Sequence, residues 1–151
     1  MSETYLLRRE QLVPASLEET FRFFADAANL QDITPPWLHF RILSAPEHIE
    51  TGSEIRYRLR WHGIPLNWRT RITRWDMPLT FEDFQESGPY RLWHHTHTFQ
   101  ASPEGTLMTD IVRYALPLGP LGRLAHWIAV RKSVEEIFEY RYRRIAEIFA
   151  R

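Results

Sequence analysis

The sequence has no cysteine and only one lysine, Lys132, beside 18 arginines. The lack of cysteine excludes disulfides, thiolate metal ligands and a cysteine nucleophile, so histidine, aspartate, glutamate, tyrosine and serine remain as candidates for chemistry. The formal net charge is zero at pH 7, and no global field draws the chain to nucleic acid or to an anionic membrane. We therefore expect no nucleic-acid partner.

Long apolar runs are absent as well. The first twenty residues lack the continuous apolar stretch of a signal peptide, and no later segment approaches the roughly 20 apolar residues of a membrane span. We expect a cytoplasmic location and no stable membrane insertion. Because single hydrophobic cores are typically built from about 100 to 150 residues, we expect residues 1–151 to form one domain.

Aromatic residues, in contrast, are abundant, at 14% of the chain with six tryptophans. Tryptophan and tyrosine bring a large apolar area with one polar group each. These rings must therefore be buried or face a ligand.

Helical signals lie near both ends of the chain. Residues 4–13 read as a strand, after which Ser16 and Glu19 match a capping box that opens a helix running to about Ala28. Residues 29–33 add a further turn before two prolines stop helical geometry. From Leu121 to Arg151, apolar residues recur at helical spacing, which predicts a long C-terminal helix whose broad apolar face packs on the sheet.

Between these helices, from Trp37 to about Ala115, the apolar period falls to two and turn residues recur at regular intervals. This pattern predicts an antiparallel meander of about six strands, because the connections are too short for parallel crossovers. On the strands around residues 54–61 and 66–72, alternation places one apolar set inward. That set includes Tyr57, Leu59, Trp68 and Thr70.

The stretch LWHHTHTF, residues 92 to 99, holds three of the seven histidines. Successive side chains of a strand point to opposite faces, so Trp93, His95, His97 and Phe99 share one face. Suppose that the hairpin closes around residues 103–105 with Phe99 opposite Met108. The predicted opposite pairs are then His97 with Asp110, His95 with Val112 and Trp93 with Tyr114. If the preceding turn likewise sets Gln85 opposite Trp93, Asp83 is predicted to lie opposite His95.

Acid and histidine pairs on an inner face are unexpected in a dry core, since burying such groups costs free energy unless they are paired. They suit the wall of a ligand cavity. The predicted ligand-binding residues are Tyr57, Leu59, Trp68, Thr70, Asp83, Gln85, Trp93, His95, His97, Phe99, Asp110, Val112, Tyr114, Val134 and Phe138.

Four segments carry a resemblance to a known superfamily: NLQDITPPWLHFRIL (29–43), GSEIRYRLRWHGIPLNWRTRI (52–72), FEDFQESGPYRLWHHTHTF (81–99) and GTLMTDIVRYALPLGPLG (105–122). The chain resembles the START-like, or SRPBCC, superfamily, and within it a bacterial polyketide cyclase/dehydrase-like ligand-binding branch. The resemblance implies an α+β helix-grip fold, in which a curved antiparallel sheet of about seven strands wraps around a long C-terminal helix. It also implies a cavity between the sheet and this helix.

Three classes of function stay open. Members of the superfamily bind lipids, sterols, quinones, hormones and polyketides, and only some are enzymes, so we favour binding of a small hydrophobic, partly polar ligand without catalysis. A cyclase or dehydratase would use His95 or His97 with Asp83 or Asp110 as general acid and base. An accessory role, through a homodimer or through an epimerase-like partner such as the domain fused to some relatives, is the third class.

A metal site is a further interpretation of the histidines. Two histidines at i and i+2 on a strand can bind one ion, with Asp83 or Asp110 as a third ligand. Because no clear third and fourth ligand stands out, we expect neither a metal nor another cofactor.

Overall fold

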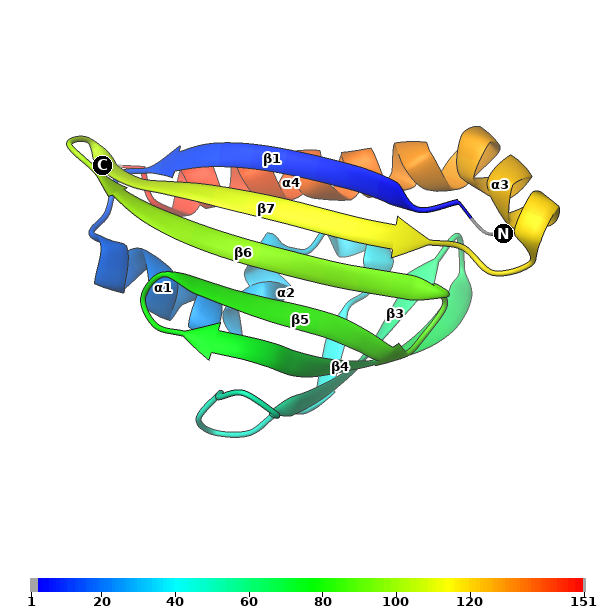
Figure 1. The fold of residues 1–151 in the computed structure, drawn as a ribbon, viewed down its shortest axis with the longest axis horizontal. Helices are drawn as coiled ribbons and strands as arrows, with labels where there is room; N and C mark the ends of the chain where they lie inside the picture. The colour runs from blue at the N-terminus through cyan, green and yellow to red at the C-terminus, as the bar shows by residue number, and fades with distance from the viewer. Residues whose placement is uncertain (1–2, 151) are drawn as a thin grey trace.

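The protein is described by a computed structural model that covers residues 3–150. Across these residues, seven antiparallel strands form one sheet in the order β1-β7-β6-β5-β4-β3-β2, as predicted for a helix-grip fold (Figure 1). The strands are β1 (Tyr5–Val13), β2 (Arg41–Ser44), β3 (Glu54–Trp61), β4 (Ile64–Asp76), β5 (Thr80–Ser87), β6 (Leu92–Ser102) and β7 (Gly105–Ala115).

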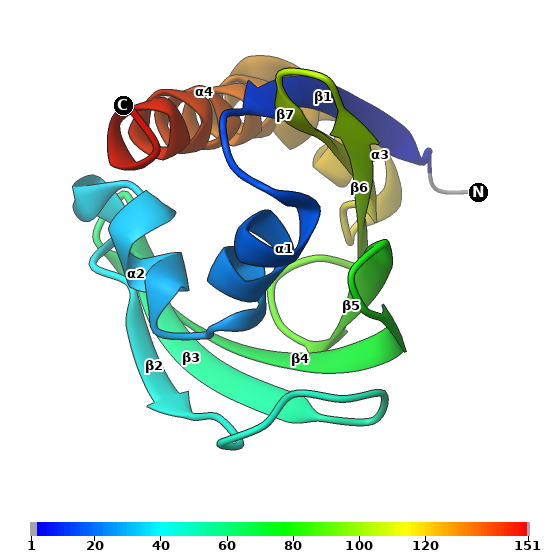
Figure 2. The ribbon, with the colours of Figure 1, turned by 90° about the vertical axis from the view of Figure 1, so that its left-hand side faces the viewer.

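The helices lie on the concave face of this sheet. Seen end-on, the sheet curls into a half-barrel, with the C-terminal helix along one margin and the two early helices in the opening (Figure 2). The helical elements are α1 (Leu17–Ala25), α2 (Asn29–Ile33), the 3-10 helix η1 (Pro36–Leu38), α3 (Gly119–Ala125), the π-helical turn η2 (His126–Val130) and α4 (Arg131–Ile148). No helix within residues 3–150 is both long and apolar enough to cross a membrane.

The first helix begins where the sequence predicts and ends earlier. The Ser16 side chain accepts a hydrogen bond from the Glu19 backbone N–H at 3.1 Å, which caps α1. The predicted end at Ala28 is wrong, because Asp26 has extended backbone angles. Its carboxylate accepts a hydrogen bond from the Ala28 N–H at 3.0 Å, an alternative to helical pairing that Asp readily provides.

The strand registers around the histidines agree with the prediction at all but one pair. Strands β6 and β7 pair with Phe99 opposite Met108, His97 opposite Asp110, His95 opposite Val112 and Trp93 opposite Tyr114. Strands β5 and β6 pair with Asp83 opposite His95, and their ladder ends at Phe84 opposite His94, so the predicted pair of Gln85 with Trp93 does not form.

A glycine makes the close approach of β7 to β1 possible. Gly105 has a φ of +143°, and a Cβ atom there would collide with the carbonyl oxygen of Val13. The glycine allows the hairpin between β6 and β7 to close while β1 pairs along the other edge of β7.

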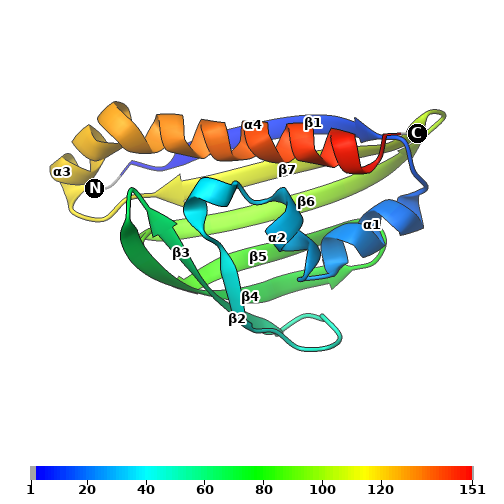
Figure 3. The ribbon, with the colours of Figure 1, turned by 180° about the vertical axis from the view of Figure 1, so that it is seen from behind.

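The core has two parts, and α4 covers only the β1–β7 end of the concave face. Near α1, Phe21 is fully buried and makes edge contacts with Trp75, Phe81 and Phe99. Along β7, a second cluster joins the strand directly to the helix, with Val112, Tyr114, Val134 and Phe138 as its buried members. Figure 3 shows α4 running along β1 and β7, while β3 and β4 lie away from it.

The C-terminal helix is not packed along its whole length, contrary to the prediction of one broad buried face. Val134, Phe138, Ile145 and Phe149 are buried, as predicted. Leu121, Leu124, Trp127, Ile128 and Tyr142 are exposed. The physical reason at the N-terminal end is that Gly122 and His126 occupy the packed side of α3 and η2, so the large apolar side chains lie on the side that faces away from the sheet.

Candidate functional site

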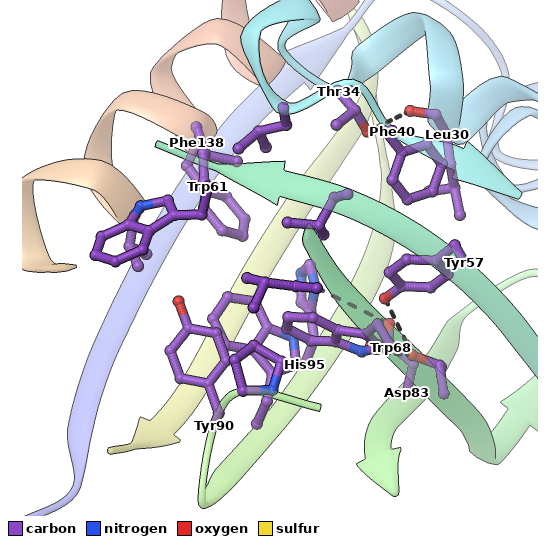
Figure 4. Close-up of a pocket in the computed structure, with 18 of the residues that line it drawn as sticks. Leu30, Thr34, Phe40, Tyr57, Trp61, Trp68, Asp83, Tyr90, His95 and Phe138 are labelled. Atoms are coloured by element: carbon purple, nitrogen blue, oxygen red, sulfur yellow. Dashed lines mark hydrogen bonds and ion pairs between the residues drawn. The ribbon is translucent and has the colours of Figure 1, made fainter. Parts of the chain in front are cut away.

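A cavity of about 410 Å³ lies between the concave face of the sheet and the helices. Its floor is formed by β3, β4, β5 and β6, and α1, α2, η1, α3 and α4 close its other sides. Figure 4 shows Tyr57, Trp68, Tyr90 and His95 directed into this space, with Phe138 on the opposite side. Most of the side chains in the wall are apolar or aromatic, which is typical of a small-molecule site.

The aromatic wall is held together by ring contacts and one buried threonine. Tyr57 stacks near Trp68, with ring centroids 5.7 Å apart, and Trp93 meets Trp68 edge-on at 5.4 Å. The Thr70 hydroxyl lies 3.1 Å from the Tyr57 hydroxyl and accepts a hydrogen bond from Trp68 Nε1 at 3.0 Å. Burial, and secondarily the charge of Asp83, raises the pKa of Tyr57. Its phenol is therefore a neutral group that can donate a hydrogen bond.

The polar end of the cavity contains two histidines and two aspartates in one network. His95 Nε2 lies 2.8 Å from Asp110 Oδ1, and His97 Nε2 lies 2.7 Å from Asp83 Oδ2. Each histidine therefore reaches the carboxylate diagonal to it, although the opposite residues on the ladder pair His97 with Asp110 and His95 with Asp83. The predicted acid and histidine contacts form, but with exchanged partners.

Each histidine also approaches the carboxylate that stands opposite it on the ladder, at a longer distance. These contacts join the four side chains into one network. His95 Nδ1 lies 3.9 Å from Asp83 Oδ2, beyond hydrogen-bonding distance. His97 Nδ1 lies 3.2 Å from Asp110 Oδ1 without the alignment of a hydrogen bond. The two imidazole rings stack with centroids 3.7 Å apart.

Arg141 of α4 completes the network, and the sequence analysis missed it. Its Nη2 donates to Asp110 Oδ1 at 3.3 Å, and its guanidinium carbon lies 5.2 Å from the centre of the Phe24 ring and 6.0 Å from that of Phe138. The residue is buried and borders the cavity. Its Nε finds no hydrogen-bond partner among residues 3–150, which leaves one buried donor beside the cavity.

The surroundings shift the pKa values of the two histidines in opposite directions. Burial and the neighbouring charge of His97 lower the pKa of His95, against the opposing effect of the carboxylates. Burial also disfavours charge on His97, but its contacts with Asp110 and Asp83 outweigh burial and raise its pKa. His97 therefore keeps its proton to a higher pH than His95 does.

Both carboxylates are held in the charged form. Burial alone would raise the pKa of Asp110, but the charge of Arg141, the hydrogen bond with His95 and the close contact with His97 hold it well below its ordinary range. At Asp83 the hydrogen bond from His97 and the nearby positive charges likewise outweigh burial and lower the pKa. When His97 is protonated, two carboxylates balance one guanidinium and one imidazolium, and the buried network is neutral as a whole.

Three of these side chains could hold a metal by geometry. Asp83, His95 and His97 each offer a ligand atom, and these atoms lie within 4.8 Å of one another. The charge of the site does not favour a dication, because Arg141 already supplies a positive charge beside the carboxylates, and a protonated His97 would supply a second. That no metal is required stays a prediction.

The structure brings ten of the fifteen predicted ligand-binding residues to the cavity. They are Tyr57, Leu59, Trp68, Thr70, Asp83, Trp93, His95, His97, Val134 and Phe138. The other five, Gln85, Phe99, Asp110, Val112 and Tyr114, are not in its wall.

Three of these five lie on β7, where α4 packs directly on the strand. Val112 is fully buried beneath Val134 and Phe138, and Asp110 lies behind the histidines, which it touches. Tyr114 packs in the same cluster, and its hydroxyl lies 2.8 Å from His126 Nε2. Alternation identifies the inward face of a strand, but it does not show which part of that face a helix covers.

The remaining two residues have structural partners. Phe99 belongs to the cluster around Phe21. The Gln85 side chain accepts a hydrogen bond from the Tyr90 N–H at 3.1 Å and donates to the Tyr90 carbonyl at 2.7 Å, which fixes the turn between β5 and β6. Tyr90 itself borders the cavity and was not predicted, because it lies in a turn where alternation gives no signal.

This architecture, with a curved seven-stranded sheet gripping a long C-terminal helix over a cavity, is that of the START-like (SRPBCC) superfamily. Residues 13–138 match the family model described as polyketide cyclase / dehydrase and lipid transport. The chain belongs to that family. No curated protein is similar enough in sequence to count as a match.

Solved structures of low sequence identity share the fold over almost the whole chain. Protein CV1439 from Chromobacterium violaceum has a TM-score of 0.73 at 14% identity, over 97% of this chain and 99% of that one. The protein TTHA0849 from Thermus thermophilus has a TM-score of 0.67 at 19% identity, over 95% and 99%. The major latex-like protein 151 from Panax ginseng has a TM-score of 0.67 at 13% identity, over 98% and 99%.

Proposed function

We propose that the protein binds a small, mainly apolar molecule that carries at least one oxygen acceptor, such as a lipid, quinone or polyketide-like compound, in the cavity between sheet and α4. The observation that carries this proposal is a largely aromatic and aliphatic cavity with one buried polar end. Membership of the family supports the same class of ligand.

The polar end favours an oxygen acceptor on the ligand. Arg141 Nε is a buried donor without a partner in the described chain, and the raised pKa of Tyr57 keeps its phenol protonated. A buried donor left unpaired costs about 1 to 3 kcal/mol. A carbonyl, quinone or hydroxyl oxygen would remove that cost. With His97 protonated the network is neutral as a whole, so it does not require a charged ligand.

A cavity-filling substitution tests the site. Leu59 borders the cavity, whereas its neighbour Arg58 is exposed on the outer face of the same strand. With the fluorescent apolar probe N-phenyl-1-naphthylamine, Leu59→Trp is expected to weaken binding at least about tenfold, because the larger ring occupies the space. The matched control Arg58→Trp is expected to bind like the unmodified chain. Equal binding by the two folded variants would exclude this cavity as the probe site.

Native mass spectrometry of protein gently purified from its own organism identifies the natural ligand class. The native mass is compared with the denatured mass. An organic adduct that is present in the unmodified chain and lost in Leu59→Trp would support the proposal. An adduct that both forms retain would place the ligand elsewhere.

A second candidate is acid–base catalysis of a cyclase or dehydratase type, and the state of His95 favours it. With Asp110 fixing a proton on Nε2, the neutral ring has its lone pair on Nδ1. That atom could take a proton from a carbon next to a carbonyl while the C–H electron pair stays on the substrate as an enolate. Asp110 would stabilise the resulting imidazolium, and the Tyr57 phenol would donate to the enolate oxygen.

Deuterium exchange separates catalysis from binding alone. In D₂O, exchange of the central C–H of a 2-alkyl-1,3-diketone is followed by NMR. Catalysis predicts that the unmodified chain accelerates exchange and that His95→Gln loses at least about 100-fold of this acceleration. His94→Gln, on the outer face of the same strand, is the control. No acceleration by the unmodified chain at saturating diketone would leave binding as the function.

A further inference from the structure

An exposed apolar surface covers the outer side of α3 and η2. We define the α3–η2 surface by five side chains, whose exposed fractions are 75% for Leu118, 66% for Leu121, 54% for Leu124, 79% for Trp127 and 64% for Ile128. Single exposed apolar residues are ordinary, but a contiguous group of this kind marks a surface that binds something.

The polarity of this segment is reversed relative to an ordinary surface helix. Its inward side carries the buried Gly122 and His126, and His126 contacts the Tyr114 hydroxyl. The large apolar side chains point outward instead. Since the inward side already has its partners, the outward side is not a core face that has lost its cover within the described chain.

The charge around the surface has one sign along the segment. Residues 115–134 contain Arg123, Arg131 and Lys132 and no acidic residue. The exposed Arg91 is placed at the same end by its backbone hydrogen bond to Ala115 at 2.9 Å. Glu135 and Glu136 follow one turn later and pair with Arg131 and Lys132 at 3.4 and 3.8 Å. Glu3 lines a small pocket together with Arg123, Trp127, Arg131 and Glu135.

The surface also borders the cavity. Leu118 and Leu121 line the cavity and are exposed to solvent at the same time. Beside them, Trp61 Nε1 donates to Ser133 Oγ at 2.9 Å and joins the end of β3 to α4. A molecule that entered or left between these elements would pass directly over the α3–η2 surface.

We propose that the α3–η2 surface docks on the lipid–water interface of a membrane that contains anionic lipid. Leucine, isoleucine and one tryptophan on an outward helical face, next to basic residues, are the composition of helices that lie in this interface without spanning the bilayer. Tryptophan is favoured there because its ring is amphipathic. Docking would place the cavity margin against the lipid, so an apolar ligand could pass between membrane and protein without crossing water.

The absence of cysteine makes a site-specific test direct. Leu124→Cys and, as a matched control, the similarly exposed Leu79→Cys at the opposite end of the molecule each receive the polarity-sensitive fluorophore NBD. With vesicles of phosphatidylglycerol and phosphatidylcholine, the label at position 124 is expected to shift to shorter emission wavelength and brighten, and the label at 79 to stay unchanged. The change is expected to be smaller with pure phosphatidylcholine and in about 0.5 M NaCl.

Vesicle sedimentation then tests the apolar side chains. The pair Leu121→Glu and Trp127→Glu is expected to lower the vesicle-bound fraction at least about tenfold, whereas Leu79→Glu is expected to leave it unchanged. Because the changed residues are exposed, folding is checked by an unaltered melting temperature. Binding of the folded pair variant equal to that of the unmodified chain would overturn the proposal.

A second copy of the chain is the alternative occupant. If the unmodified chain dimerises with rising concentration in light scattering, the pair variant stays monomeric, and neither binds vesicles, the surface is a self-association interface and the lipid proposal is wrong. These readouts need no knowledge of the ligand, so they stand apart from the probe-binding test of the cavity.

Discussion

His95 Nε2 lies 2.8 Å from Asp110 Oδ1, although Asp110 stands opposite His97 on the neighbouring strand. The crossed contact means that each histidine touches both carboxylates, one closely and one at longer range. Removal of any one member therefore leaves several buried partners unsatisfied, and single substitutions in this network are expected to act non-additively.

Loss of one carboxylate is expected to destabilise the fold strongly. Asp110→Asn keeps the shape but leaves the buried Arg141 without its counter-charge, which predicts a fall of about 3 to 5 kcal/mol in the free energy of unfolding. Urea denaturation measures it. Glu54→Gln, in an exposed pair with Arg56, serves as the control with an expected change below about 1 kcal/mol. Equal effects of the two substitutions would contradict the network.

The two histidines predict opposite pH dependences. The pKa of His97 is raised in the folded chain. Its contribution to the free energy of unfolding is therefore fully present below pH 6.5, near the ordinary pKa of histidine, and is lost as the pH rises through the raised pKa. The pKa of His95 is lowered, so the unfolded chain binds that proton first and stability falls as the pH drops below about 6.5. The free energy of unfolding should therefore be highest near pH 6.5, between an acid decline caused by His95 and an alkaline decline caused by His97.

Substitution of His97 tests whether this residue causes the fall in stability above neutral pH. In urea denaturation between about pH 5 and pH 9, His97→Gln should remove the decline above neutral pH, whose slope is at most about 1.4 kcal/mol per pH unit for one proton. His94→Gln, whose ring faces Glu82 on the outer surface, should retain it. A decline that persists unchanged in His97→Gln would show that another group causes it.

The hydrogen bond between Trp61 and Ser133 is expected to slow passage into the cavity. Both residues border the cavity, and the bond joins the β3 end to α4. Because a net hydrogen bond contributes about 0.5 to 1.5 kcal/mol, Ser133→Ala should speed the entry and release of N-phenyl-1-naphthylamine by up to about tenfold in stopped-flow fluorescence. Ser53→Ala, in a remote turn, should leave both rates unchanged. Unaltered rates in Ser133→Ala would place the route elsewhere.

Zinc is expected not to stabilise the unmodified chain. The guanidinium of Arg141 lies beside Asp110, so a dication would add charge to a balanced site. Arg141→Met removes that cation, so Asp83, His95 and His97 become free to bind zinc, and zinc should raise the melting temperature of this variant. Melting temperatures with and without excess ZnCl₂ provide the measurement, since a ligand that binds only the folded state raises the midpoint. A zinc-dependent rise in the unmodified chain would contradict the prediction.

Periodicity predicted the strands and the inward side of the histidine strand well. The alternation of polar and apolar residues, together with the turn at residues 103–105, was sufficient to place His97 opposite Asp110. Exchange of the close partners was not predictable, because ladder position fixes backbone neighbours and leaves the side-chain rotamers open.

The helix side of the site could not be found in this way. Arg141 lies 31 positions after Asp110 in the sequence, and on a helix rich in arginine nothing distinguishes a buried one from its exposed neighbours. For the same reason, helical spacing grouped Leu121, Leu124 and Ile128 on one face without showing that this face turns away from the sheet.

The π-helical turn at residues 126–130 determines which side of α4 faces the sheet. Buried or partly buried positions recur every four residues at Gly122, His126, Val130, Val134 and Phe138, and each such step overshoots a full α-helical turn by about 40°. The wider turn absorbs part of this drift and keeps the stripe facing the sheet. Deletion of one residue there would swing Arg141 about 100° around the helix axis, away from Asp110. The charge balance of the cavity therefore depends on a residue count more than ten positions upstream of Arg141.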